Sequence, residues 1–441
     1  MYYHTLGDFQ SAQSRDRYLQ LTDLLAKDRF ADFPAWARPD PATALDGRKI
    51  VACGTKMIGE AILAAQNFHL HAVVDDTLKK QNSHYLGVPV LTTEEWIRMA
   101  KADSDVVSLI LANTSPAFNH FARAVAQNNL KALKAIDLLR ISALAGKNVT
   151  GAGTTFVYGL PFYEDAVANA ETHLKLAEKF ADDYSRLTYF NLLNYRITSN
   201  PAYLDQCAIR HNTHPDQSLD SYAINRSFFD IGDDEVYVDG GGFTGDTVAQ
   251  FIHAVRGQFR KIYCFEPAPA MLAECRKTFI RTQNVYPRRF LKDIVLVDKG
   301  LWNKVDVLSF NSSLFSGEES ELGTALPQSA HIVESGLTGH LYDESVEKAN
   351  SVQIPVTSID ECCEGPVSLI KLEIEGSEPQ ALEGAARTIE RHRPKLAVSV
   401  YHMADHLHRL PQQVLDFDQG YWLFLRQHNP AVPDATVCYC A

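Results

Sequence analysis

The chain has 441 residues, of which 46% are hydrophobic and 22% charged, so it can form sizeable cores in two or three globular domains. Its net charge of −12 argues against a nucleic-acid-binding surface, which needs a basic stripe. No apolar run approaches the roughly 20 residues of a membrane span, and the opening stretch MYYHTLGDFQ lacks the pattern of a signal peptide. The eight cysteines are scattered, without a CxxC pair, and predict thiols in a reducing cytoplasm and no metal site.

Residues 1–142 are predicted to form a small Rossmann-like α/β domain. Four segments read as strands, RKIVACG, LHAVVDD, DVVSLILAN and KALKAIDLL, and MIGEAILAAQNF reads as a helix. The turn ACGTKMIG contains Gly54 and Gly59, but Ala52 and Met57 stand where a dinucleotide-binding turn would have glycines. We therefore expect a packing or oligomerisation platform without tight dinucleotide binding, and a homo-oligomer stays open.

Residues 143–230 are predicted to be a helical connector. The segment EDAVANAETHLKLAEKFADDYSRLTYFNLLNYRI has apolar residues at helical spacing, with Pro161 before it and Pro201 after it. Its stripe of leucine, phenylalanine and tyrosine is typical of a packing face.

Residues 231–441 carry the clearest chemical pattern. The segment DEVYVDGGGFTGDTVAQFI predicts a strand, a glycine turn and a helix whose first amides are free to bind a ligand. The next strand, KIYCFEP, ends in Glu266, 21 positions after Gly245, which is the spacing at which an acid binds ribose hydroxyls in a doubly wound nucleotide site. The predicted cofactor-binding residues are Asp239, Gly240, Gly241, Gly242, Phe243, Thr244, Gly245, Asp246, Thr247, Glu266 and Pro267.

Two cofactors compete for this turn. Gly240, Gly242 and Gly245 satisfy GxGxxG, so an NAD-dependent oxidoreductase is a rival interpretation. A pyrophosphate favours a neutral or positive site, whereas Asp239 and Asp246 flank this turn and no lysine or arginine lies within it. S-adenosylmethionine carries an ammonium, a sulfonium and a ribose diol but no phosphate, and it suits the acidic flanks better.

The third part resembles the FkbM-type S-adenosylmethionine-dependent methyltransferases along nearly its whole length. The resemblance rests on VYVDGGGFTGDT, YCFEPAPAML, VTSID, LIKLEIEGSEPQALEGAARTIERHRPKLAVSVYH and YWLFLRQHN. It implies a Rossmann-like methyltransferase domain with a mostly parallel sheet and an antiparallel strand near the end. It also implies O-methylation of a sugar, a glycan or another small hydroxylated metabolite. The first acid of the IKLEIEG segment is usually aspartate in this family and is Glu373 here.

The stretch LIKLEIEG is predicted to be the fourth strand of that sheet, with Glu373 and Glu375 on one face. Unpaired carboxylates in a sheet are costly, so we predict that Glu373 and Glu375, with His402 after the fifth strand, are catalytic. Lys371 could pair with one acid, and Glu378 could complement the dipole of the following helix. Two further residues, His406 and His408, are expected on a helix surface.

These observations predict a cytoplasmic methyltransferase acting on a small-molecule or glycan acceptor. A non-catalytic nucleotide-sugar-binding protein with the same fold is the second rival. The polar stretch 311–350 interrupts the third part and is expected to be either a lid or a surface insertion.

Overall fold

The computed structural model describes residues 11–54, 70–80, 83–112, 114–145, 159–209, 225–311, 351–430 and 433–441. The chain divides into two compact units. The first comprises Met1–Glu178, Asp182–Ile209 and Asn429–Asp434, and the second comprises Lys179–Ala181, Arg210–His428 and Ala435–Ala441. The helices between residues 160 and 207 thus cluster with the first unit, and the division into three parts stays a prediction.

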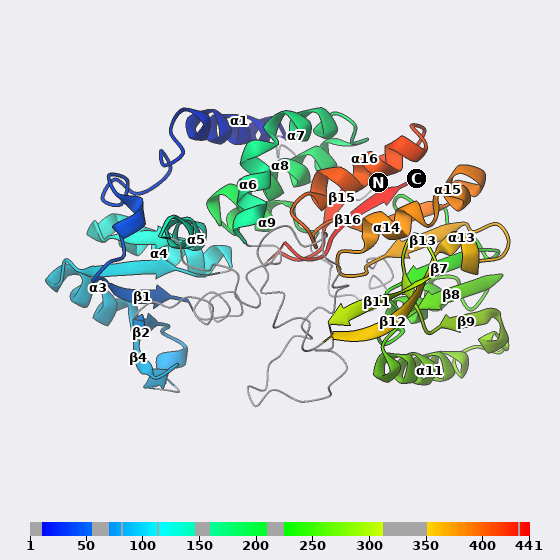
Figure 1. The fold of residues 1–441 in the computed structure, drawn as a ribbon. Helices are drawn as coiled ribbons and strands as arrows, with labels where there is room; N and C mark the ends of the chain where they lie inside the picture. Colours follow the sequence, from blue (N-terminus) through cyan, green and yellow to red (C-terminus); the bar gives the residue numbers. More distant parts are fainter. Residues whose placement is uncertain are drawn as a thin grey trace. The chain divides into compact units, whose positions relative to one another are not determined.

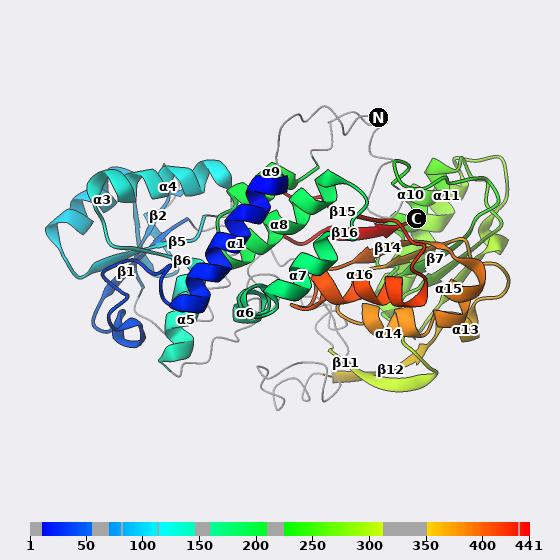
Figure 2. The same cartoon turned by 90° about the horizontal axis from the view of Figure 1, so that it is seen from above.

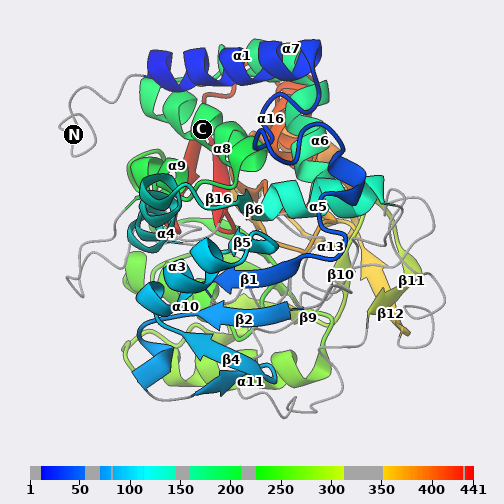
Figure 3. The same ribbon diagram turned by 90° about the vertical axis from the view of Figure 1, so that its left-hand side faces the viewer.

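The first unit is built on a six-stranded sheet in the order β3-β4-β2-β1-β5-β6 (Figure 3). Its strands are β1 (Lys49–Cys53), β2 (Leu70–Val74), β3 (His84–Tyr85), β4 (Val88–Leu91), β5 (Val106–Ile110) and β6 (Ala132–Lys134). All neighbours pair in parallel except β3 and β4. This is the predicted Rossmann-like arrangement. The segment KALKAIDLL is wrong as a strand beyond Lys134, because helix α5 begins at Ala135.

Helices cover both faces of that sheet. The helices of the first unit are α1 (Ser11–Lys27), α3 (Thr93–Ala102), α4 (Ser115–Asn128), α5 (Ala135–Leu144), α6 (Leu160–Ala168), α7 (Ala170–Ala177), α8 (Asp183–Thr198) and α9 (Ala202–Cys207). Trp96 of α3 and Phe121 of α4 pack on one face, and Leu138 of α5 packs on the other. The long amphipathic segment of the predicted connector forms three helices, α6 to α8, and α1 lies along α8 (Figure 2).

The second unit contains a seven-stranded sheet in the order β15-β16-β14-β13-β7-β8-β9 (Figure 1). Its strands are β7 (Val236–Gly240), β8 (Lys261–Phe265), β9 (Ile294–Val297), β13 (Leu369–Leu372), β14 (Lys395–Ser399), β15 (Leu423–Gln427) and β16 (Thr436–Cys440). β16 is antiparallel to both neighbours, and the other pairs are parallel. The predicted fold class is therefore confirmed, and LIKL is the fourth strand of this sheet in chain order.

This sheet lies between two layers of helices (Figure 2). One layer holds α10 (Asp246–Ala254) and α11 (Pro269–Gln283), and the other holds α14 (Glu378–Glu383), α15 (Ala386–His392) and α16 (His406–Phe417). The short helix α13 (Ile359–Cys362) packs against α15. Because helices cover both faces of this sheet, β7 and β13 are buried along their whole length, including the charged residues that they carry.

A separate three-stranded sheet has the order β10-β12-β11, with β10 (Gly300–Leu301), β11 (Asp306–Asn311) and β12 (Ser351–Thr357). β11 and β12 are antiparallel, and Asn311 stands opposite Ser351. Residues 312–350, for which a lid or insertion is expected, lie outside the described residues, as does the predicted helix MIGEAILAAQNF. Among the residues described, no helix has both the length and the apolar character that a membrane crossing requires.

Candidate active site

The glycine turn joins β7 to α10 at the carboxyl edge of the second unit's sheet. Gly241 and Gly245 have φ angles of 84° and 79°, in the left-handed region that favours glycine. A Cβ on Gly241 would stand 2.0 Å from the carbonyl oxygen of Glu373, and a Cβ on Gly242 would stand 2.4 Å from Sγ of Cys264. The protein's own close packing therefore requires these glycines, whatever ligand the turn binds.

A buried lysine supports this turn from the neighbouring strand. The strand register places Lys371 of β13 beside Asp239 of β7. The Lys371 Nζ lies 3.1 Å from the Asp239 carboxylate and donates hydrogen bonds to the carbonyls of Gly240 and Gly241, at 3.1 and 2.8 Å. Burial alone disfavours the ammonium, but the nearby carboxylates, Asp239 first and then Glu373, together outweigh it and raise the pKa of Lys371. The Thr247 hydroxyl donates to the other Asp239 oxygen at 2.7 Å.

The charge of the turn differs from what the sequence suggests. Asp239 is fully buried and ion-paired, so its carboxylate supports the turn from within the protein. Of the two flanking acids, Asp246 is the one on the exposed side, at the first position of α10. No lysine or arginine lies within the turn itself, but Lys371 reaches it from the neighbouring strand β13. Its main partner is Asp239, and the Glu373 carboxylate is more distant at 3.7 Å.

Glu266 lies beside the turn, as its spacing predicts. One oxygen of its carboxylate accepts the N–H of Phe243 at 2.8 Å, and the other accepts the N–H of Ala268 at 2.8 Å. Burial raises the pKa of Glu266, and the two amides partly offset that effect. A carboxylate has about four acceptor positions, so Glu266 keeps capacity for two hydroxyl donors. Phe243 is 42% exposed, and Thr244 and Pro267 are half-buried.

β13 ends at Leu372, earlier than the sequence suggests, and a turn follows it. The amides of Ile374 and Gly376, which a longer strand would use for pairing, donate to the two oxygens of Glu378 at 2.8 and 3.1 Å. Glu375 has a φ of 55°, in the left-handed region that few non-glycine residues adopt. Such conformations cost about 1–3 kcal/mol and cluster at functional sites.

Glu373 and Glu375 therefore do not share a strand face, and that prediction is wrong. Each acid instead has its own partner in the segment after β14. The Tyr401 hydroxyl donates to Glu373 at 2.9 Å, and Nε2 of His402 lies 3.4 Å from Glu375. The two acidic side chains are 24% and 35% exposed, so both reach solvent at the sheet edge where ligands bind in open α/β sheets.

His402 lies between two carboxylates. Its Nδ1 is 2.9 Å from Glu378 and its Nε2 is 3.4 Å from Glu375. The second oxygen of Glu378 is 3.5 Å from Nδ1 of His406, the first residue of α16. Glu378 is fully buried and both histidines are 2% exposed. The expectation that His406 is a surface residue is wrong, while His408 is half-buried.

These contacts set different protonation states for neighbouring groups. Burial opposes charge on His402, but Glu378 and Glu375 outweigh it and raise the pKa of the imidazole to about 9. Burial likewise opposes charge on Glu378, but His402, with smaller contributions from His406 and the Ile374 amide, outweighs it and lowers the pKa of that carboxyl to about 2. Burial raises the pKa of Glu375, which His402 only partly offsets. Burial lowers the pKa of His406 to about 4.

At neutral pH the cluster thus holds an imidazolium at His402, clamped by an ionised Glu378, beside a more exposed carboxyl group at Glu375. An imidazolium has no free lone pair, so His402 can stabilise charge but cannot accept a proton. A partly exposed carboxyl group whose pKa is raised by burial is a stronger base than an ordinary carboxylate, so it is better suited to accept a proton.

Glu373, Glu375 and His402, which the sequence motifs single out, lie close together, but the sequence does not predict the contacts that Glu378, Tyr401 and His406 make in this cluster. The sequence shows that Glu378 follows Gly376 closely. Its contacts could not be predicted, because they depend on the turn at residues 373–376, whose amides Glu378 accepts.

Residues 235–424 match the family described as the methyltransferase FkbM domain. The chain carries an FkbM methyltransferase domain. The resemblance inferred from the sequence motifs is therefore confirmed. The match includes the glycine turn, Glu266, the turn after β13 and His402.

The chain also resembles solved structures. The crystal structure of a methyltransferase FkbM from Methylobacillus flagellatus KT matches with a TM-score of 0.75 and 23% identity, over 98% of this chain and 100% of that chain. At that identity the likeness shows a shared fold. A chain from Clostridium thermocellum described as an rRNA methylase matches with a TM-score of 0.28 and 11% identity, over 53% of this chain and 98% of that chain. No curated protein matches the sequence significantly.

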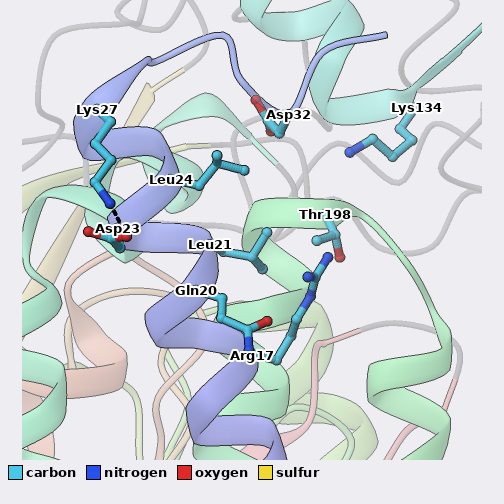
Figure 4. A pocket seen from close by; sticks show the side chains of 9 residues that line it. All are labelled: Arg17, Gln20, Leu21, Asp23, Leu24, Lys27, Asp32, Lys134 and Thr198. Carbon is cyan, nitrogen blue, oxygen red and sulfur yellow. Dashed lines mark hydrogen bonds and ion pairs between the residues drawn. The ribbon is translucent and has the colours of Figure 1, made fainter.

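The first unit contains a cavity of about 400 Å³ between α1, the end of α8 and the start of α5 (Figure 4). Its lining residues are Arg17, Gln20, Leu21, Asp23, Leu24, Lys27, Asp32, Lys134 and Thr198. Lys27 pairs with Asp23 at 2.6 Å, and Asp32 pairs with Arg140 at 2.8 Å. Because these charges are compensated within the protein, we assign the cavity no function.

Proposed function

We propose that the second unit transfers a methyl group from S-adenosylmethionine to a hydroxyl of a sugar, a glycan or another small metabolite. The observation that carries the proposal is the placement of Glu266 beside the glycine turn, within an FkbM domain. An acid at this position suits a ribose diol. The acceptor class rests on the family resemblance.

The residues present fit such a donor. Glu266 offers acceptor positions for the ribose hydroxyls, and Phe243, Thr244 and Pro267 are accessible around it. When bound, the donor supplies the electrophilic methyl group. We propose that Gly240–Thr247 and Glu266–Pro267 hold it, with Asp239 and Lys371 fixing the turn from within.

Among the three predicted catalytic residues, we propose a division of roles. Glu375 is partly exposed and its pKa is raised, so it accepts the proton of the acceptor hydroxyl. His402 is held as an imidazolium and stabilises the carboxylate form of Glu375. Glu373 is fixed by the Tyr401 hydroxyl and orients the acceptor by accepting a hydrogen bond.

The donor site is tested by calorimetry with S-adenosylhomocysteine. Glu266→Ala should weaken binding by about 1–3 kcal/mol, because two ribose hydroxyls lose a buried acceptor. Glu274→Ala on the outer face of α11 is the matched control, since Glu274 pairs with Lys277 near the surface. If Glu266→Ala binds S-adenosylhomocysteine as tightly as the wild type, the proposed contact between Glu266 and the donor ribose is wrong. Parallel titration with NADH separates a methyltransferase from an oxidoreductase. A methyltransferase should bind S-adenosylhomocysteine more tightly than NADH, and an oxidoreductase should do the reverse.

A further inference from the structure

We propose that Glu378 is a positioning residue that locks His402 between two carboxylates and so holds the imidazole Nε2 toward Glu375. The proposal rests on the proposed methyl transfer and adds to it a support that the sequence motif does not reveal. Glu378 touches no solvent, so it cannot contact a substrate, and its shortest side-chain contact among the described residues is with Nδ1 of His402.

The position of Glu378 is fixed by the backbone. Its two oxygens accept the amides of Ile374 and Gly376, so the carboxylate is tied to the same turn that carries Glu375. A buried carboxylate with two amide donors cannot swing freely, because moving it would leave those amides unpaired. Glu378 and Glu375 are thus two ends of one rigid turn.

His402 spans the two ends of that turn. Its Nδ1 meets Glu378 at 2.9 Å and its Nε2 meets Glu375 at 3.4 Å, while its ring centroid lies 4.1 Å from that of Tyr401. An ionised Glu378 at 2.9 Å favours a proton on Nδ1, and the imidazolium then carries its second proton on Nε2, the nitrogen that lies 3.4 Å from Glu375.

The charged and titratable groups around His402 come from three segments. They are Lys371 on β13, Glu373, Glu375 and Glu378 on the turn and α14, and Tyr401, Asp405, His406 and Arg409 around α16. Of these, Glu378 is the buried acid in closest contact with the ring. Removing its charge should therefore lower the pKa of His402 more than any other single change among the described groups.

The experiment compares full-length wild type with Glu378→Gln, which keeps an oxygen for one backbone amide and removes the charge. Glu390→Gln, on the exposed side of α15, is the matched control. Histidine nitrogens are labelled with ¹⁵N, and His402 is assigned by its loss in His402→Asn. In wild type and control, His402 should stay protonated through pH 7, and in Glu378→Gln it should titrate at least one pH unit lower.

Activity gives the second readout, with methyl transfer to an accepting glycan fraction and S-adenosylhomocysteine affinity measured together. Glu378→Gln should lower kcat at least about tenfold and shift the pH profile, with donor affinity unchanged. A wild type that transfers no methyl group overturns the proposed function but leaves the histidine titration to test the positioning role. If wild-type His402 titrates near pH 6.5, or if kcat and the His402 titration are unchanged in Glu378→Gln, the positioning role is wrong. Should Glu378→Gln fail to fold, the wild-type titration decides.

Discussion

Replacing Lys371 with methionine should strongly destabilise the second unit. The change keeps a long apolar stem and removes the ammonium that faces Asp239, which has no exposed surface. Removing one partner of a buried ion pair typically costs about 3–5 kcal/mol, because the other charge stays buried without compensation. The Thr247 hydroxyl still donates to Asp239 and offsets part of this. The carbonyls of Gly240 and Gly241 also lose their lysine donor. We therefore expect the free energy of unfolding to fall by about 4 kcal/mol.

A double-mutant cycle isolates the pair. Asp239→Asn removes the stranded charge while keeping the side-chain shape, so Lys371→Met/Asp239→Asn should be more stable than Lys371→Met alone. Urea denaturation gives the free energies, and hydrogen exchange on β7 and β13 assigns the loss to this sheet. Tryptophan fluorescence alone would mix the units, because Trp96 lies in the first and Trp302 in the second. A loss below about 1 kcal/mol in Lys371→Met, or a double variant no more stable than it, would refute the reasoning.

Further predictions follow from the turn and the histidine cluster. Gly241→Ala should cost several kcal/mol or abolish folding, because its Cβ meets a carbonyl oxygen at 2.0 Å, whereas Gly365→Ala shares a positive φ in open space and should cost only about 1–2 kcal/mol in urea denaturation. Stability should fall as pH drops from about 6.5 to 4, because the unfolded chain protonates His406 before the folded chain does, and His406→Gln should lack this step. A further loss should run from about pH 4.5 to 2, because Glu378 is ionised in the fold and must be protonated; an acid limb identical in Glu378→Gln would contradict it.

The parts of the fold set by periodicity could be predicted from the sequence. The alternation of strands and helices in residues 231–441 predicts a parallel sheet, and the βαβ spacing brings Glu266 to the turn. The partner of Asp239 could not be found in this way, because Lys371 becomes its neighbour only once β13 is known to pair with β7.

The end of β13 was mispredicted for a specific reason. The alternation of apolar and acidic residues continues through Glu375, so the pattern favours a longer strand. In the structure Glu378 takes the amides of Ile374 and Gly376, and this side-chain capture competes with strand pairing. The same hydrogen bonds place the Glu378 carboxylate beside His402. The early end of β13 and the cluster around His402 therefore have the same cause.

The hairpin of β11 and β12 has a practical consequence for engineering. The chain departs after Asn311 and returns at Ser351, its direct partner in the antiparallel ladder. Residues 312–350 thus connect two residues that are already paired across the β11–β12 ladder. A two-residue Asn-Gly turn could connect the same two strands. Because each doubling of loop length costs only about 0.6 kcal/mol in closure entropy, shortening it should leave the fold intact. A trimmed enzyme of this kind would show, through its acceptor range alone, whether the segment selects the substrate.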